Sequence, residues 1–188
     1  MAKTSAEIRD CLSVAVKDNA LVRIDRRIKK ADRLEGYLVG LGERWALLHV
    51  VSHDWLLNGY TAFRIGDVKR VRRWDERSDF PARALAHFGQ EPRPACAIQL
   101  DSTRSLIEST AQRSPLVTIF TEYRRPDVCY IGKPVAVARR RLRMVQIDPG
   151  ARWRSKPTKW DLRDVSRVEF GGRYEEALAA LGGRAKGI

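Results

Sequence analysis

Apolar residues recur along this chain with two different periods, and each change of period marks the boundary of an element. Ile8, Leu12 and Val16 follow one another at helical spacing, and Thr4 and Glu7 have the spacing of a capping box, so the sequence predicts a first helix here. From residue 22 to residue 74, apolar and polar residues alternate in short runs separated by turn signals, the pattern of antiparallel strands. The runs predict five strands, at residues 22–28, 34–41, 45–51, 60–65 and 68–74.

The same pattern then occurs a second time. Leu21–Ile24 (LVRI) matches Leu116–Ile119 (LVTI) at an offset of 95 residues, and Asp67–Val71 (DVKRV) matches Asp164–Val168 (DVSRV) at an offset of 97. A second helix is predicted over Thr103–Arg113. We infer a duplicated unit, because self-similarity at a fixed period indicates a repeated structural element.

The alignment of the two copies makes specific structural predictions. With an offset of 97 residues it places Trp45 opposite Leu142 and Phe63 opposite Trp160, and the last two are expected to occupy equivalent inward positions. The predicted organisation is a first helix and strand unit, a linker with a short helix, and a second helix and strand unit that ends in a C-terminal helix. Their bounds are 1–76, 77–101 and 102–188.

Glycines inside the second predicted strand indicate a barrel. Gly36 and Gly40 predict the sharp bending that closure of a small barrel requires. A helix followed by five bent strands resembles the Sm-like (LSm/Hfq-type) fold or a related SH3-like small barrel. In the first copy, Glu35–Leu48 resembles the first Sm motif and Arg64–Val68 resembles the second. The resemblance implies a mainly β fold with short helices, made of two tandem Sm-like five-stranded antiparallel barrels, each preceded by an α-helix.

The sequence departs from the family pattern at two places. Trp45 and Ala46 stand where RNA-binding members place an asparagine, and Asp161–Val165 lacks the glycine of the second motif. The resemblance therefore implies the fold more strongly than the uridine pocket of the family, since a fold alone does not determine function.

Positive charge is concentrated in the second copy. The chain has 36 Lys and Arg against 23 Asp and Glu, a net charge of +13, and residues 114–188 carry +8 of it. Such an excess favours a polyanion partner, because each neutralised phosphate releases counterions; the alternative is that the charge only keeps the protein in solution.

Several basic residues are interleaved with tryptophans, which is typical of surfaces that bind single strands. Trp153 either pins its loop, residues 148–157, or is exposed and stacks on a base, whereas Trp160 is expected in the core because it matches Phe63. With Trp153 as the stacking residue, the predicted nucleic-acid contacts are Arg64, Arg72, Arg73, Arg139, Arg140, Arg141, Arg152, Trp153, Arg154, Lys156 and Lys159.

No motif in the sequence indicates catalysis. Phosphate-binding, hydrolase and zinc-protease motifs are absent, and His49 and His53 lie at the end of a predicted strand, where their spacing does not suit a metal. We therefore expect no enzyme activity, catalytic residue, metal or cofactor. Three widely spaced cysteines predict free thiols and a cytoplasmic location, with Cys129 buried, and no apolar run is long enough to span a membrane.

Two functions of different kinds remain. One is a non-enzymatic module that binds RNA or single-stranded DNA through a basic face. The alternative is a protein–protein interaction module, such as an adaptor, an immunity-type inhibitor or an assembly subunit, with no nucleic-acid role. Exposed edge strands predict either pairing of the two copies within the chain or a small homo-oligomer.

Overall fold

The computed structural model describes residues 4–74 and 80–185, which form a mainly β fold with short helices. The expected domain boundary at residues 76 and 77 lies outside the described residues. In chain order the elements are α1 (Ser5–Lys17), β1 (Leu21–Arg26), β2 (Leu34–Leu41), β3 (Trp45–Val51), β4 (Leu57–Arg64), the 3-10 helix η1 (Ile65–Asp67), β5 (Val68–Arg73), α2 (Phe80–His87), α3 (Thr103–Arg113), β6 (Val117–Phe120), β7 (Cys129–Val137), β8 (Arg141–Gln146), β9 (Thr158–Asp161), β10 (Arg167–Phe170) and α4 (Arg173–Gly182).

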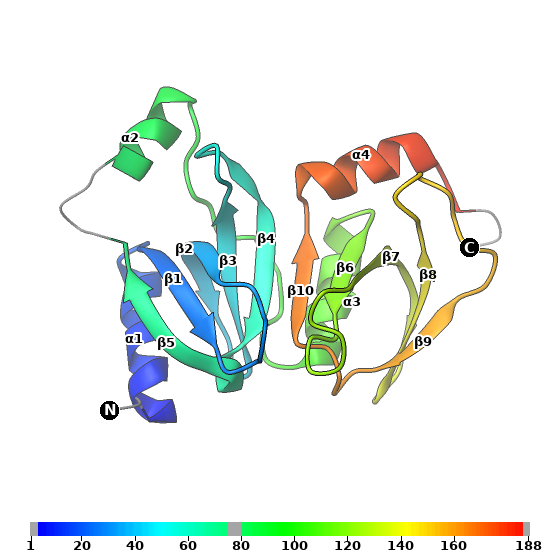
Figure 1. Cartoon of the computed structure of the whole chain (residues 1–188), viewed down its shortest axis with the longest axis horizontal. Helices are drawn as coiled ribbons and strands as arrows, with labels where there is room; N and C mark the ends of the chain where they lie inside the picture. The colour runs from blue at the N-terminus through cyan, green and yellow to red at the C-terminus, as the bar shows by residue number, and fades with distance from the viewer. Residues whose placement is uncertain (1–3, 75–79, 186–188) are drawn as a thin grey trace.

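The ten strands form one antiparallel sheet in the order β5-β1-β2-β3-β4-β10-β6-β7-β8-β9. We call α1 and β1–β5 the first half, and α3, β6–β10 and α4 the second half. Figure 1 shows the two halves side by side, with β4 and β10 adjacent at the centre. The expected closed barrels are not observed. The edge of β4 that closure would require is paired with β10 of the other half instead, so the sheet stays open.

The strand pairing repeats between the halves, as the inferred duplication requires. In each half the fifth strand precedes the first, second, third and fourth in the sheet. Val22 pairs with Gly36 in the first half and Val117 with Gly132 in the second, and β2 and β7 carry bulges at matching positions. Each half also begins with the predicted helix.

The registers correct the alignment within the third strand. Ala46 pairs with Phe63, and Leu142 pairs with Trp160. Phe63 and Trp160 are therefore equivalent in pairing, as predicted. The counterpart of Leu142 is Ala46 rather than Trp45, because the second one-residue shift falls after the third strand and not before it.

Two equivalent glycines allow adjacent strands to approach closely. A Cβ atom on Gly36 would lie 2.4 Å from the carbonyl oxygen of His49, and one on Gly132 would lie 2.1 Å from that of Val145. Both contacts are with backbone that cannot move away locally, so each position requires glycine.

Capping explains where the two predicted helices begin. The Thr4 hydroxyl accepts a hydrogen bond from the Glu7 amide, and the Glu7 carboxylate accepts one from the Thr4 amide, which completes the capping box of α1. Ser102 caps α3 by accepting from the Ser105 amide. Among the described residues, no helix is long and apolar enough to cross a membrane.

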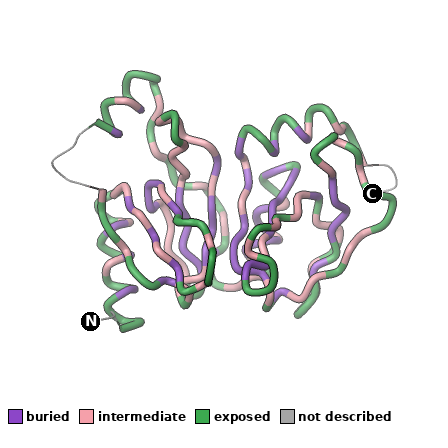
Figure 2. Tube along the Cα trace, viewed as in Figure 1, coloured by how far each residue is buried: buried purple, intermediate pink, exposed green. Residues whose placement is uncertain are grey.

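Buried residues lie on both sides of the junction between the halves (Figure 2). The core of the first half lies between its strands and α1 and includes Leu12 and Phe63, both fully buried. The core of the second half surrounds α3 and extends to the first half, where it includes Trp45 and Ala62. The core of the second half thus spans the junction between the halves.

A buried ion pair also links them. The Glu122 carboxylate, from the second half, accepts hydrogen bonds of 2.5 and 2.7 Å from the two terminal nitrogens of Arg26, and neither side chain is exposed. Ser166 donates to the same carboxylate at 2.7 Å, and Arg167 lies 3.4 Å away. Burial raises the pKa of Glu122, but the Arg26 hydrogen bonds and the Arg167 charge outweigh burial and lower it overall.

Candidate nucleic-acid interface

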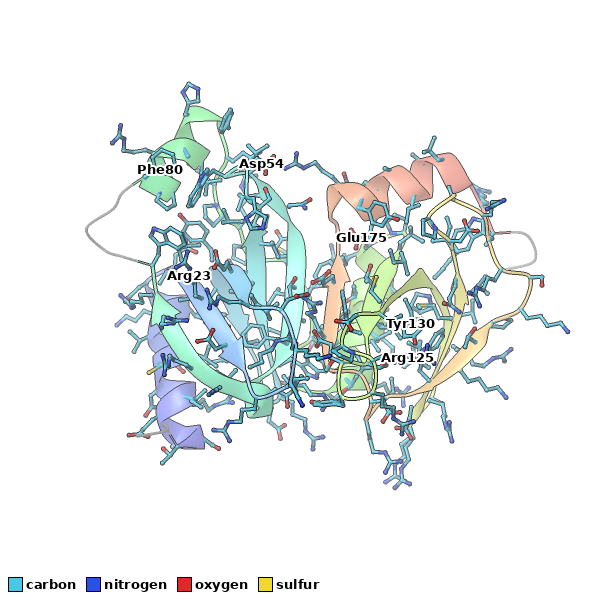
Figure 3. The ribbon with its side chains drawn as sticks, viewed as in Figure 1. Arg23, Asp54, Phe80, Arg125, Tyr130 and Glu175 are labelled. Atoms are coloured by element: carbon cyan, nitrogen blue, oxygen red, sulfur yellow. The ribbon has the colours of Figure 1, made fainter. Side chains whose placement is uncertain are left out.

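A basic pocket of about 420 Å³ opens in the second half. The loop after β6, the strands β7, β8 and β9, and the turn after β9 all contribute to it. We call it the basic pocket; its lining residues are Thr121, Arg124, Arg125, Tyr130, Arg141, Lys159, Trp160, Asp161, Arg163 and Asp164. Figure 3 labels two of them, Tyr130 and Arg125, which lie close together in the lower part of the second half.

Two aromatic rings line the basic pocket. Tyr130 projects from β7 and Trp160 from β9, with ring centroids 5.5 Å apart and planes tilted by 56°. Both side chains are half-buried and pack against the core of the second half. Trp160 is held in place by its strand pairing with Leu142 and by packing against the core, and part of its surface faces the pocket.

Five cationic side chains surround these rings, and all five residues are exposed. Two are paired with carboxylates: Arg163 with Asp161 at 2.9 Å, and Arg124 with Asp164 at 3.3 Å. The Arg163 hydrogen bonds lower the pKa of Asp161, so this carboxylate is ionised at neutral pH.

The other three cations are Arg125, Arg141 and Lys159. None of them forms an ion pair with any residue that the structure describes. The pocket therefore has five cations against the two carboxylates of Asp161 and Asp164, and this excess of positive charge beside aromatic surface suits a phosphate and a base together.

Two of the predicted contact residues, Arg141 and Lys159, line this pocket. Arg139 and Arg140 occupy the bend between β7 and β8, directly before Arg141, and are exposed. The remaining predicted cations of the second half, Arg152, Arg154 and Lys156, are exposed in the loop between β8 and β9 but do not line the pocket.

Trp153 pins its loop, the first of the two alternatives. Its indole nitrogen donates hydrogen bonds of 3.0 and 3.3 Å to the carbonyls of Gly182 and Gly183, at the end of α4. The ring packs in a small cluster with Leu116 and Leu178. Trp153 does not line the basic pocket, whose aromatic rings are those of Tyr130 and Trp160.

Arg64 joins the two halves. Its guanidinium donates to the carbonyls of Val165 at 2.7 Å and Leu162 at 3.0 Å, across the junction between β4 and β10. It also lies 5.0 Å from the centroid of the Trp45 ring. These contacts are internal, so Arg64, a predicted nucleic-acid contact, instead holds the second half against the first.

The other first-half predictions, Arg72 and Arg73, lie on β5 at the outer edge of the sheet. Arg72 forms an ion pair with Asp25 at 2.9 Å, and Arg73 forms one with Asp18. Because β5 and β9 are at opposite ends of the strand order, Arg72 and Arg73 are distant in the sheet from the basic pocket.

Sequence reasoning assigned no contact to Tyr130, Arg124, Arg125 or Arg163. Arg124 and Arg125 are recognisable as adjacent basic residues in the sequence. Tyr130 had a weaker signal: it is the counterpart of the buried Leu34 in the first half, so a hydroxyl at this position marks a difference between the copies.

A larger hollow, of about 620 Å³, is lined mainly by the first half and on one side by β10 of the second half, and its lining carries mixed charge. Arg23 lines it, forms an ion pair with Glu35 at 2.8 Å and lies 4.0 Å from the centroid of the Trp74 ring. Arg167 lines it too and lies 3.2 Å from Glu169. Because these cations are already paired, the hollow is a poorer phosphate site than the basic pocket.

The histidines and cysteines form no metal site among the described residues. The ring of His49 stacks on Tyr60 at 4.4 Å, and burial lowers its pKa to about 4. The prediction that Cys129 is buried was wrong: it is exposed, because it is the first residue of β7 and the buried position of that strand is Gly132.

No protein-family model, curated protein or solved structure matches this chain.

Proposed function

We propose that this protein is a non-enzymatic module that binds single-stranded RNA or DNA through the basic pocket. The observation that carries the proposal is the placement of Arg125, Arg141 and Lys159, which form no ion pair with a described residue, around the rings of Tyr130 and Trp160.

The chemistry of the pocket fits a nucleotide better than a simple anion. Arginine and lysine side chains neutralise phosphates, and the aromatic rings offer stacking surfaces worth about 1–3 kcal/mol per base. Neither interaction depends on base identity, so we expect weak sequence preference. A net charge of +13 would further accelerate association with a polyanion.

The fold proposal accompanies the functional one. We propose that each half is an Sm-like or related SH3-like unit, on the basis of the leading helix, the shared strand order and the strongly bent second strand. The cytoplasmic location expected from the cysteines is also part of the proposal, and it agrees with the free thiols of Cys11, Cys96 and Cys129.

One observation favours the alternative of a protein partner. Phe80, the first residue of α2, and Phe88, in the turn directly after α2, are 52% and 55% exposed and offer apolar surface to a partner. Binding through them would be far less sensitive to salt than phosphate binding.

Charge reversal in the pocket tests the proposal. The double variant Arg125→Glu/Lys159→Glu changes exposed side chains, so it should fold normally. We expect its affinity for a fluorescent oligonucleotide of mixed sequence to fall at least about tenfold. The matched control is Lys17→Glu/Arg173→Glu, which makes the same charge change outside the pocket and should weaken binding far less.

Equal losses in the two variants would show that net charge, and not the pocket, controls binding. Unchanged affinity in the pocket variant would refute the proposal and favour the protein partner.

A further inference from the structure

The loop after the first strand is basic in both halves. By the offset of 95 residues that relates β1 to β6, Lys29 and Lys30 correspond to Arg124 and Arg125. Both pairs are exposed. The two adjacent arginines of the basic pocket, Arg124 and Arg125, thus have counterparts in the first half.

The two loops meet at the junction of the halves. A hollow of about 400 Å³ is lined on one side by Arg27, Lys29 and Lys30 and on the other by Tyr123 and Pro126. The Tyr123 hydroxyl donates a hydrogen bond to the Asp67 carboxylate of the first half, which fixes the second loop against the first half. Arg124 and Arg125 follow Tyr123 directly and line the basic pocket.

The charge of this hollow is uncompensated. Arg27, Lys29 and Lys30 form no ion pair with a carboxylate among the described residues. The acidic side chain in its lining, Glu122, is fully buried and bonded to Arg26.

An aromatic ring lies between the two basic pairs. Tyr123 is 48% exposed although its hydroxyl is bonded to Asp67. Burial and the adjacent Asp67 raise the pKa of Tyr123, so the phenol is neutral at physiological pH and does not repel phosphate. Alternation of cations with an aromatic surface is the arrangement that accommodates a single strand.

We infer that a nucleic-acid strand held in the basic pocket continues over Tyr123 to Lys29 and Lys30, so that the two halves form one binding track. The inference rests on the proposed function and adds a second site, in the first half, for the phosphates of the same strand. A strand long enough to reach both sites binds more tightly than a short one, because the second contact is intramolecular.

Oligothymidylates of two lengths test the inference. One has about 4 nucleotides, enough for the basic pocket, and the other about 15, enough for the whole track. The variant Lys29→Glu/Lys30→Glu should weaken binding of the long oligomer at least about tenfold and change binding of the short one less than about twofold. It should also reduce the salt slope for the long oligomer by about 0.7 for each lost phosphate contact.

The control variant is again Lys17→Glu/Arg173→Glu. Lys17 lies before β1 and Lys29 lies after it, so the two lysines are at opposite ends of that strand. Arg173 lies after β10, whereas the loop after β6 adjoins the beginning of β10. Both control charges therefore lie away from the end where the two loops meet. The control should affect neither oligomer by more than about twofold.

Each other outcome overturns the track. If the lysine variant weakens both oligomers equally, Lys29 and Lys30 act through the general field of the protein. If it weakens neither, while Arg125→Glu/Lys159→Glu weakens both, binding is confined to the basic pocket and the proposed function stands without the track. If wild type binds neither oligomer at about 50 mM salt, the proposed function itself fails.

Discussion

The buried pair of Arg26 and Glu122 should dominate the stability of the junction between the halves. Replacing Arg26 with Met leaves the Glu122 carboxylate fully buried, with only Ser166 as a hydrogen-bonding side chain and Arg167 at 3.4 Å. Breaking a buried pair by removing one partner typically costs about 3–5 kcal/mol. We expect Arg26→Met to lower the free energy of unfolding by that amount.

Removing both partners should cost much less. Arg26 Nε is buried without a hydrogen-bond partner among the described residues, so the native pair is itself incompletely compensated. Well-packed apolar replacements of buried pairs are often neutral or stabilising. Arg26→Met/Glu122→Leu should therefore be within about 2 kcal/mol of wild type, which gives a coupling energy of several kcal/mol in a double-mutant cycle.

Urea unfolding followed by tryptophan fluorescence and circular dichroism measures these differences. The matched control is Arg104→Met, which breaks an exposed pair with Glu108 at 2.8 Å and should change stability by less than about 0.5 kcal/mol. The reasoning is refuted if Arg26→Met costs less than about 1 kcal/mol, or if the double variant is no more stable than the single one.

The same pair predicts a dependence on pH. The pKa of Glu122 is lower in the folded chain than its ordinary value of 4.5, so folding favours the ionised form. Its stabilising contribution is complete above the unfolded pKa and is lost as the pH falls through the lower folded pKa. The difference between wild type and Arg26→Met should therefore shrink in acid.

Three further predictions concern the core, the close strand approaches and assembly. Phe63→Ala should lower the free energy of unfolding by about 3–5 kcal/mol, because the side chain is fully buried; a loss below about 1 kcal/mol would contradict this placement. Gly36→Ala and Gly132→Ala should each cost about 1–3 kcal/mol in urea unfolding, whereas Gly66→Ala, which meets open space, should cost less than about 0.5 kcal/mol; equal effects would refute the close-approach argument. Both outer strands, β5 and β9, carry basic residues, so we expect a monomer at micromolar concentration, and a dimer in light scattering would overturn that expectation.

Local patterns were enough to predict the elements. The capping box at Thr4, the Ser102 cap and the period-two runs depend on neighbours within a few residues, and the structure has these elements within a few positions of the expected bounds. The internal repeat was also visible, because apolar identities survive at matching positions such as Val68 and Val165.

Contacts between distant residues were not predictable in the same way. The pairing of β4 with β10 leaves the sheet open, and no local signal distinguishes an edge that closes a barrel from one that pairs with a second copy. Arg26 and Glu122 are ordinary charged residues in the sequence, yet 96 positions separate them. Trp153 is held by Gly182 for the same long-range reason.

The candidate site was predicted in part. Arg141 and Lys159 were identified from basic runs, and they do lie together in the basic pocket. Tyr130 was missed, because no local pattern shows that the Tyr130 ring, on β7, lies 5.5 Å from the Trp160 ring, on β9.

The most direct test of nucleic-acid binding is the salt dependence of affinity for a single-stranded oligonucleotide of about 15 nucleotides. We predict that the logarithm of the binding constant falls linearly with the logarithm of salt concentration between about 50 and 200 mM, with a slope near −0.7 for each neutralised phosphate. Contacts from Arg125, Arg141, Lys159, Lys29 and Lys30 would give a slope of about −3.5. A slope near zero, or no binding at the lower salt concentration, would contradict the account.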